Sequence, residues 1–477
     1  MHVATSSAFK ENAHHALANA GLQRALARSG GSFIARRAAA VAGLPEFESL
    51  CDTARDIKNH TLAHLDFYLE EYERKVLASG GQVHWCADAA AARAVVLAIC
   101  EKAGARTVTK GKSMISEELA INDHLERHGI TPVETDLGEY IIQLRHELPS
   151  HIIAPAFHLN LEDWEEAFRK SHTDLPADRV FAERRDILTE ARTKLRSQFL
   201  AADVGITGAN FLIAETGSSV IVTNEGNGDL TQTLPKVHIV LASIEKMVPT
   251  IEDCTSLLRV LARSATGQEF SVYTTFSTGA RRPGDLDGPE EYHVVLVDNG
   301  RSAMIGTEFQ DMLRCIRCAA CMNHCPVYGA IGGHAYGWVY PGPMGAVLTP
   351  GLIGVKEAGQ LPNASTFCGK CESVCPVRIP LPKLMRHWRE REFERHLTPA
   401  AMRWNLGIWG FFARRPLLYR MATRAVAVSL GWIGRKKGRF SKMPFAGGWT
   451  EARDLPAPEG DTFFARYARE QRARALT

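Results

Sequence analysis

The sequence predicts an α/β domain in the middle of the chain, followed by a smaller helical domain that carries most of the cysteines. Two observations predict this arrangement. Short β-rich segments alternate with helical periodicity from about residue 82 onward, which is typical of a parallel sheet with helices on both faces. Seven of the eleven cysteines then lie between positions 315 and 375.

The elements follow from the spacing of apolar residues and from glycine and proline breaks. Residues 1–78 read as helices, and the helical pattern at 61–78 ends at Gly80-Gly81. Beyond these glycines we expect strands at 82–86, 106–109, 130–134 and 152–155, and helices at 89–102, 115–128 and 137–144. After a charged helical stretch near 161–202, we expect strands at 211–214, 220–223, 238–241, 270–275 and 293–297, several of them antiparallel.

These patterns divide the chain into four parts. We expect an N-terminal helical arm at 1–64, an α/β domain at 65–300, a helical cysteine domain at 301–395 and a basic helical tail at 396–477. The arm is rich in arginine like a transit peptide, but its helical periodicity continues into the next segment and favours an arm.

Composition narrows the class of protein. A net charge of +3 and 45% hydrophobic residues are typical of a globular chain, and we expect no nucleic-acid partner. We find no apolar run long enough to cross a bilayer. Without a secretory signal, the scattered Cys51, Cys86, Cys100 and Cys254 read as buried free thiols, which together with thiolate chemistry suggests the cytoplasm.

The cysteines between 315 and 375 form two related motifs. The first is C-x2-C-x2-C-x3-C-P, and the second is a partial copy. The first spacing is that of bacterial two-cluster ferredoxins, in which the fourth cysteine ligates the other cluster. It predicts two iron–sulfur clusters with crossed ligands: Cys315, Cys318, Cys321 and Cys375 for cluster one, and Cys325, Cys368 and Cys371 for cluster two.

Zinc is the alternative, but zinc sites usually combine paired C-x2-C units with four ligands, which seven cysteines and two Cys-Pro pairs fit badly. The second motif lacks one thiolate, because Ser365 stands where the counterpart of Cys315 would be. Cluster two is therefore a [4Fe–4S] cube with an oxygen ligand or an open iron, or a [3Fe–4S] cluster. Ser365 is a candidate ligand, and His324, Glu372 or a side chain of a partner are the alternatives.

Other segments carry weaker signals, and no catalytic residue is identified. Residues 110–113 resemble the end of a phosphate loop, but Arg106 replaces the leading glycine, so we expect no nucleotide there, although the amides can hold some anion. No G-x-G-x-x-G follows a strand, so no nicotinamide or flavin site is predicted. Glu215 and Glu225 flank a strand, either in a ligand site at the sheet end or as turn residues on a solvated edge.

The tail is basic and aromatic. Between Glu394 and Glu451 there is no acidic residue, but there are eleven Lys or Arg residues interleaved with aromatic side chains such as Trp404, Trp409 and Trp432. Helices of this composition can lie on an anionic membrane or dock an acidic partner. The alternative is that the aromatic side chains pack on the core of the chain itself.

In combination, these motifs resemble lactate utilisation protein B. The likeness covers nearly the whole chain and includes 210–227, 234–236, 298–302, the Cys315 motif, 331–337, 340–343 and 451–456. It implies a middle domain like ribose-phosphate isomerase and CoA transferase, two [4Fe–4S] clusters on the same seven cysteines, and a role in oxidising L-lactate to pyruvate. It also implies two partners, a cysteine-rich subunit of heterodisulfide-reductase type and a smaller relative of the middle domain.

We therefore expect an iron–sulfur electron-transfer subunit of an L-lactate-oxidising complex, which is not active alone. One alternative is a stand-alone oxidoreductase that binds a small organic acid in the α/β domain. Another is a redox-sensing or regulatory iron–sulfur protein.

Overall fold

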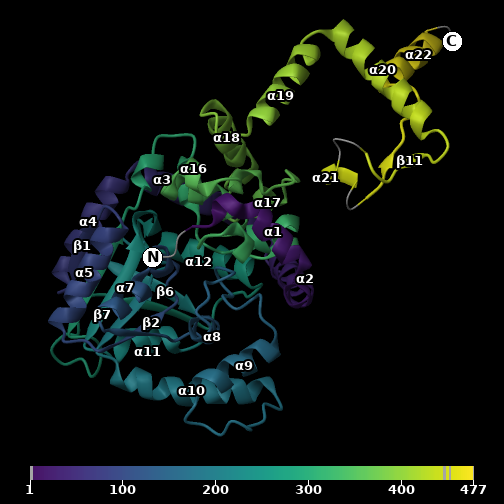
Figure 1. Ribbon diagram of the computed structural model, residues 1–477. Helices are drawn as coiled ribbons and strands as arrows, with labels where there is room; N and C mark the ends of the chain where they lie inside the picture. Colours follow the sequence, from purple (N-terminus) through teal and green to yellow (C-terminus); the bar gives the residue numbers. More distant parts are fainter. Residues whose placement is uncertain (1–3, 444–446, 451–452, 476–477) are drawn as a thin grey trace. The chain divides into compact units, whose positions relative to one another are not determined.

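The computed structural model describes residues 4–443, 447–450 and 453–475. The chain forms two compact units, Met1–Arg391 and Glu392–Thr477 (Figure 1). The first unit contains both large sheets and all the cysteines.

A six-stranded parallel sheet lies at the centre of the first unit, in the order β1-β10-β7-β4-β2-β3. Its strands are β1 (Gln82–Cys86), β2 (Thr107–Gly111), β3 (Thr131–Glu134), β4 (Val204–Gly208), β7 (Val237–Ser243) and β10 (Glu291–Val297). Alternate residues of a strand point to opposite faces. In β7, Ile239 and Leu241 enter one apolar core, whereas Val240 and Ala242 enter another, so the sheet is buried on both faces as the alternation predicted.

Different elements cover the two faces. The face of Ile239 packs against α5 (Ala89–Lys102), α6 (Met114–Glu118) and α7 (Ile121–Arg127). The face of Val240 packs against a smaller sheet of order β8-β5-β6-β9, formed by Phe211–Ile213 (β5), Ser218–Thr223 (β6), Met247–Val248 (β8) and Tyr273–Ser277 (β9). The pairs β5–β6 and β6–β9 are antiparallel, as expected for these segments.

Further helices complete the first unit. On the side of the smaller sheet lie α3 (Phe47–Ala63), α4 (Leu65–Ala78), α11 (Asn227–Thr233) and α12 (Ile251–Ala265). A third core beside β3 contains α8 (Leu137–Leu144), α9 (Leu161–Ser171) and α10 (Arg184–Ala201). The cysteine motifs lie among α13 (Ala320–Asn323), α14 (Pro326–Ile331), α15 (Gly342–Ile353), α16 (Val355–Ala358), α17 (Lys370–Ser373) and α18 (Leu381–Glu394). Short 3₁₀ turns lie at Ser6–Ala8, Ile244–Lys246, Ser302–Met304, Gln310–Arg314, His334–Tyr336 and Leu361–Asn363.

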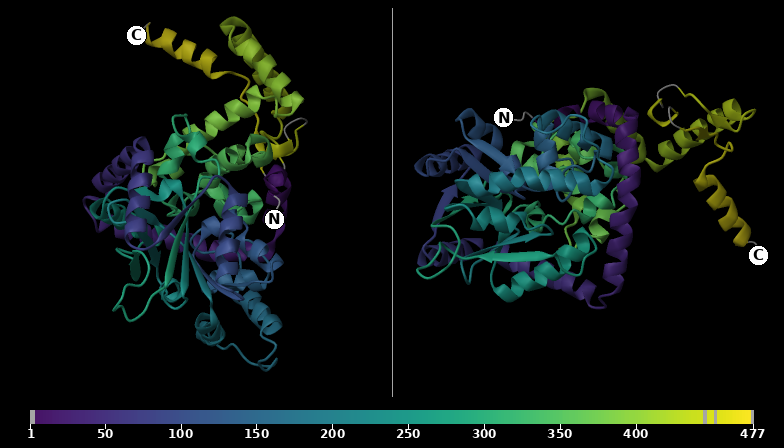
Figure 2. Two further views of the ribbon diagram at one scale, coloured as in Figure 1. Left: turned by 90° about the vertical axis from the view of Figure 1, so that its left-hand side faces the viewer. Right: turned by 90° about the horizontal axis from the view of Figure 1, so that it is seen from below.

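The first two helices lie against the cysteine motifs. Figure 2 shows the purple helix α2 (Ala20–Ala42) along the margin of the first unit, and α1 (Phe9–Ala18) precedes it. The amide of Thr5 donates a hydrogen bond to the Gly337 carbonyl at 2.8 Å, and Arg37 Nη2 donates to the Val374 carbonyl at 3.1 Å. The expected helical arm therefore contributes to the walls of the cysteine region.

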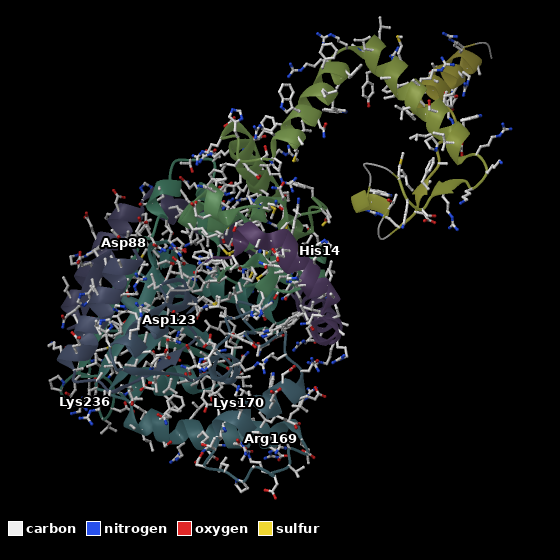
Figure 3. All side chains as sticks on the ribbon, viewed as in Figure 1. His14, Asp88, Asp123, Arg169, Lys170 and Lys236 are labelled. Carbon is white, nitrogen blue, oxygen red and sulfur yellow. The ribbon has the colours of Figure 1, made fainter. Side chains whose placement is uncertain are left out.

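The carboxyl ends of the parallel strands face the cysteine motifs. Figure 3 shows Asp88, which follows β1, and Lys236, which precedes β7, at opposite ends of the main sheet. Beyond the carboxyl ends, Tyr340 of the cysteine region donates a hydrogen bond to Glu118, the last residue of α6. Such an edge of an α/β sheet is where ligand sites form.

One expectation about this unit was wrong, and one strand was not predicted. The segment 152–155 is not a strand but irregular backbone that bends at 152–153 and enters a turn at Pro155. Pro155 lacks an amide for a sheet, and Ile152 and Ile153 pack on the core around the cysteines instead. The central strand β4 was not predicted. A Cβ on Gly205 would lie 1.8 Å from the Thr231 carbonyl oxygen, so only glycine allows α11 to approach this strand.

Two predicted helices are each interrupted once. The helix expected at 61–78 breaks at His64, and the one expected at 115–128 breaks at Ala120, which has a left-handed φ of 52°.

The second unit is helical, with one short pair of strands. Its elements are α19 (Ala400–Ala413), α20 (Pro416–Gly434), α21 (Gly447–Thr450), α22 (Phe463–Arg474) and the antiparallel strands β11 (Arg439–Phe440) and β12 (Leu455–Pro456). Among the described helices, none is long and apolar enough to cross a membrane.

Candidate functional site

The two cysteine motifs share one backbone conformation, displaced by fifty positions. Arg317 and Ala319 have φ values of 60°, and their counterparts Phe367 and Gly369 have φ values of 54° and 77°. Three of these four residues are not glycine, and left-handed backbone in other residues is strained and concentrated at functional sites. A single helical turn follows in each motif, α13 in the first and α17 in the second.

Matching hydrogen bonds extend the repeat. The amides of Asn323 and Ser373 donate to the carbonyls of Ala319 and Gly369 at the same 3.1 Å. This equivalence places Ser365 at the position of Cys315. The Ser365 hydroxyl accepts a hydrogen bond from the Phe367 amide at 3.1 Å and so holds the turn before Cys368. Its role as an iron ligand stays a prediction.

Four thiols line one small cavity, here called the thiol cavity: Cys315, Cys318, Cys321 and Cys375. Three come from the first motif and one from the second. Apolar side chains, including Ile152, Met344 and Ile379, line the rest of its wall. The thiols surround a space rather than a point, and in the described ranges no group of three or more His, Cys, Asp or Glu is arranged to hold a single metal ion.

The thiol cavity also supplies backbone donors. The Ile379 amide donates a hydrogen bond to Cys375 Sγ at 3.4 Å. Burial raises the pKa of Cys375 to about 11, although the amides of Ile379 and Val377 oppose that rise. Amide donors of this kind stabilise thiolate sulfur and tune the potential of a bound cluster. The donor set, the apolar walls and the amides together fit an iron–sulfur cube.

The other three motif cysteines lie near one another. Burial raises the pKa of the Cys371 thiol to about 12, and neighbouring Cys325 and Cys368 add to the rise. Cys368 is exposed, and the Lys370 amide and the Thr366 hydroxyl lower its pKa. The second group of thiols is therefore more open to solvent than the thiol cavity.

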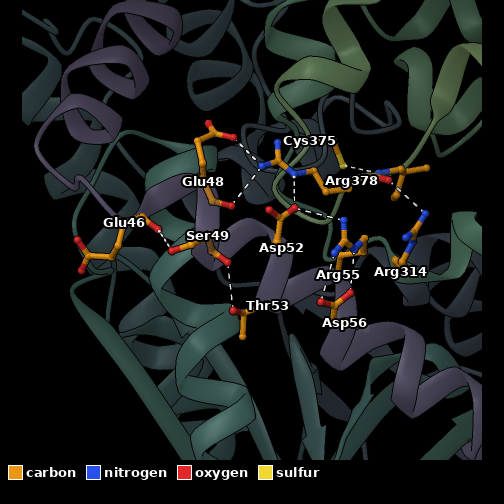
Figure 4. Close-up of polar contacts among 11 residues, drawn as sticks. Glu46, Glu48, Ser49, Asp52, Thr53, Arg55, Asp56, Arg314, Cys375 and Arg378 are labelled. Atoms are coloured by element: carbon orange, nitrogen blue, oxygen red, sulfur yellow. Dashed lines mark hydrogen bonds and ion pairs between the residues drawn. The ribbon is translucent and has the colours of Figure 1, made fainter.

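Ion pairs fasten the loop that carries Cys375 to helix α3 (Figure 4). The Arg378 guanidinium lies 2.6 Å from Glu48 and 3.2 Å from Asp52. Arg314 Nη2 donates to the Arg378 carbonyl at 3.1 Å. Helix α3 therefore fixes the position of Cys375, the last thiol of the second motif. The spacing of the cysteines does not predict this contact.

A buried charge network joins the carboxyl edge of the sheet to the first motif. Arg301, which follows β10 and has no exposed surface, donates to both oxygens of Glu118 at 2.9 and 2.7 Å and lies 2.9 Å from Glu245. Arg317 of the first motif lies 3.1 Å from the other oxygen of Glu245. Burial alone would raise the pKa of Glu245, but Arg301 and Arg317 hold it at about 2. Tyr340 also donates to Glu118, at 2.6 Å.

A second cavity, here called the edge cavity, opens at the carboxyl ends of β2, β4 and β7 and has a volume of about 180 Å³. Its lining includes Lys112 and Lys246 from the sheet domain and Arg317 from the first motif. Lys112 is neutralised by Asp136 at 2.7 Å. Burial lowers the pKa of the half-buried Lys246 to about 7, and neighbouring Arg317 contributes to the lowering. Ile152 lines both cavities.

The structure also shows the surroundings of three polar residues that the sequence singled out, Lys110, Glu215 and Glu225. Lys110 is buried between Glu117 at 2.5 Å and Glu134 at 2.6 Å, so it is not a phosphate-binding residue. Glu215 accepts a hydrogen bond from the first amide of α12, at 3.2 Å. Glu225 is exposed and lies 3.4 Å from Lys112, which lines the edge cavity.

Sequence reasoning missed Lys246, Arg301 and Arg317 as members of a site. The only signal in the sequence was position, because Lys246 follows β7 closely and Arg317 lies between two motif cysteines.

Two family models match, the LUD domain over residues 69–297 and the 4Fe-4S dicluster domain over residues 311–379. A solved structure of a DUF162 family protein from Deinococcus radiodurans aligns at 16% identity with a TM-score of 0.26, covering 49% of this chain and 98% of that chain.

Curated relatives match at high coverage. The chain is 45% identical over 424 residues to lactate utilization protein B of Shouchella clausii, covering 88% of each. It is 41% identical over 461 residues to the protein of the same name from Lysinibacillus sphaericus, covering 96% of each. It is 40% identical over 473 residues to the uncharacterized electron transport protein YkgF of Escherichia coli, covering 99% of this chain and 98% of that one. Residues 311–379 therefore form an iron–sulfur domain, and the chain belongs to the lactate utilization protein B family.

Proposed function

We propose that this protein is the iron–sulfur electron-transfer subunit of a complex that oxidises L-lactate to pyruvate. The observation that carries the proposal is the thiol cavity, which gathers thiols from both motifs in a chain whose relatives are named for lactate utilization. The name of the Escherichia coli relative, an electron transport protein, supports the same role.

The proposed ligands are those given by the crossed motif. Cys315, Cys318, Cys321 and Cys375 hold a [4Fe–4S] cluster in the thiol cavity. Cys325, Cys368 and Cys371 hold the second cluster, whose fourth ligand is Ser365 or another oxygen donor, or which is a [3Fe–4S] cluster. The apolar wall excludes water from the first cluster, whereas the exposed Cys368 leaves the second more open.

The electron count of the reaction fits a pair of one-electron carriers. Oxidation of L-lactate breaks the Cα–H and O–H bonds, forms the C=O bond of pyruvate, and releases two electrons and two protons. Iron–sulfur clusters accept and pass electrons one at a time, so two of them can carry the pair onward in turn.

On the basis of the family resemblance, we also propose the fold of the middle domain and the partners of the chain. The middle domain has the fold of ribose-phosphate isomerase and CoA transferase, and the partners are a cysteine-rich subunit of heterodisulfide-reductase type and a smaller relative of the middle domain. Thiolate ligation favours the reducing cytoplasm. The basic tail provides a peripheral contact with an anionic surface, since α19 has no buried residue within the described part of its unit.

Reduction of the clusters by substrate tests the proposal. We expect L-lactate, added anaerobically to the chain together with its two partners, to bleach the broad visible absorption of the clusters, and we expect no bleaching of the isolated chain. Cys318→Ser should abolish or greatly slow the bleaching. The matched change Cys254→Ser, at a buried thiol in α12 outside both motifs, should leave it intact. Equal turnover of L-lactate by the isolated chain and by the assembly would contradict the subunit role.

A further inference from the structure

Three cationic side chains line the edge cavity, and one of them has no ion pair with a described residue. Its three cationic groups differ in their partners. Lys112 is paired with Asp136, and Arg317 is paired with Glu245. The Lys246 side chain lines the cavity and makes no hydrogen bond or ion pair with a described residue, although the charges of Glu245 and Arg317 are close enough to act on it.

A second polar group of the cavity also lacks a partner. Glu139 lines the same cavity, and its Oε2 atom is buried without a hydrogen-bond partner among the described residues. Unpaired polar groups in a recess are costly unless a ligand or water satisfies them. An anion with a further polar group would satisfy both kinds of side chain.

Arg317 places this cavity directly beside the thiol cavity. Its backbone lies between Cys315 and Cys318, and its side chain crosses the Tyr340 ring at 4.9 Å to reach the edge cavity. Nη2 of the guanidinium faces Glu245, but an arginine has five N–H donors and can engage a carboxylate as well. A ligand held by Arg317 therefore lies next to the residues that surround the first cluster.

We propose that the edge cavity binds a small carboxylate, a 2-hydroxy or 2-oxo acid, whose carboxylate is held by Lys246 and Arg317. The volume of about 180 Å³ lies below the range of about 300–1,000 Å³ typical of sites for drug-sized ligands, and so suits a small acid. Asn210, Thr223 and Ser243 line the same cavity and offer partners for the 2-hydroxyl or 2-oxo group. The choice of acid class rests on the proposed function.

Binding to the intact chain, with its clusters in place and without partners, tests the site. Anaerobic calorimetry would titrate L-lactate and pyruvate into the parent protein, with L-lactamide as the uncharged analogue of the same shape. We expect L-lactamide not to bind. Lys246→Met should weaken L-lactate binding at least about tenfold, the loss of one charge-assisted contact. Lys246→Arg, which keeps the charge, should stay within a few-fold of the parent.

Lys170→Met is the matched control, because Lys170 lies on α9 and is exposed (Figure 3). It should leave the binding constant unchanged. The alternative role of Lys246 is to balance the negative charge of a nearby cluster. If Lys246→Met shifts the potential of one cluster but binds L-lactate as the parent does, the proposed site is wrong. It is equally wrong if the parent binds neither acid at millimolar concentration.

These outcomes separate the site from the proposed function. Lys246-dependent binding in a chain whose assembly never oxidises L-lactate would support the site and contradict the function. An assembly that oxidises L-lactate with an unchanged KM after Lys246→Met would support the function and contradict the site.

Discussion

The buried pair between Glu118 and Arg301 should make a large contribution to stability, and Glu118→Gln tests this. Glu118 accepts two hydrogen bonds from Arg301, at 2.9 and 2.7 Å, one from Tyr340 and one from Asn299, the last two both at 2.6 Å. Glutamine has nearly the same shape, but it removes the charge and replaces one acceptor oxygen with a donor. Arg301, which is fully buried, would then lose one of its two carboxylate partners.

The expected loss follows from the burial of the pair. Removing one partner of a buried ion pair typically destabilises a protein by about 3–5 kcal/mol. At about 2 °C per kcal/mol for a large unit, the apparent melting temperature should fall by about 6–10 °C. Anaerobic thermal unfolding at one fixed scan rate, followed by far-ultraviolet circular dichroism, measures the shift.

The matched control is Glu308→Gln. Glu308 also faces an arginine at 2.7 Å, Arg391, but both side chains are about one-third exposed. Exposed pairs contribute little, so its melting temperature should change by no more than about 2 °C. Equal shifts for Glu118→Gln and Glu308→Gln would refute the structural role of the buried network.

The same pair gives a pH dependence with a definite sign. Burial alone would raise the pKa of Glu118, but Arg301, Tyr340 and Asn299 lower it below the ordinary value. A lowered carboxyl pKa stabilises the folded state above the unfolded pKa of about 4.3, and this stabilisation is lost as pH falls through the folded pKa. The gap in melting temperature between parent and Glu118→Gln should therefore be full at pH 7 and shrink in acid.

Three further predictions concern the clusters and the tail. Ser365→Cys should supply a fourth thiolate, suppress the three-iron signal of air-exposed protein and shift the potential of one cluster only; if both it and Ser365→Ala leave the spectra unchanged, the fourth ligand lies elsewhere. Tyr336 is buried beside Cys325 and Cys321, and its hydroxyl has no hydrogen-bond partner among the described residues, so it can donate to a cluster sulfur. Tyr336→Phe should then lower one potential by on the order of 40 mV, the equivalent of a hydrogen bond of about 1 kcal/mol, and an unchanged potential in a redox titration would contradict this. The chain should bind anionic vesicles in a salt-sensitive way that weakens when Arg435 and Lys436 are both replaced by serine; binding in sedimentation assays that ignores salt and these changes would exclude the tail as an electrostatic contact.

Local patterns predicted much of the fold. The bounds of β1, α5 and α8 follow from periodicity and glycine breaks, because each element buries one regular set of side chains. Strand β4 was hidden because Gly205 and Gly208 supply no side chain to the pattern, although close packing of α11 requires the first of them. The segment 152–155 was predicted to be a strand because it is apolar. Its isoleucines line the two cavities instead of packing in a sheet.

The sequence also predicted one part of the candidate site, the cysteines, but not its charged residues. The cysteine spacing is local and has a chemical meaning, so the motif predicted which thiols should gather. The charge network joins Glu118, Glu245, Arg301 and Arg317, which lie far apart in the chain and meet only when parallel strands end at one edge. Among the described residues, no hydrogen bond or ion pair is formed by the Lys246 side chain, and no sequence pattern predicts this.

The iron and acid-labile sulfide content of anaerobically purified protein tests the central proposal most directly. Two clusters on the seven motif cysteines predict roughly eight iron atoms and eight sulfides per chain for two cubes, or roughly seven iron atoms and eight sulfides for one cube and a [3Fe–4S] cluster. The matched pair of variants Cys318→Ser and Cys254→Ser should separate the motif from the other thiols, with iron lost only in the first. Stoichiometric zinc, with no sulfide and no broad visible absorption, would contradict the proposal.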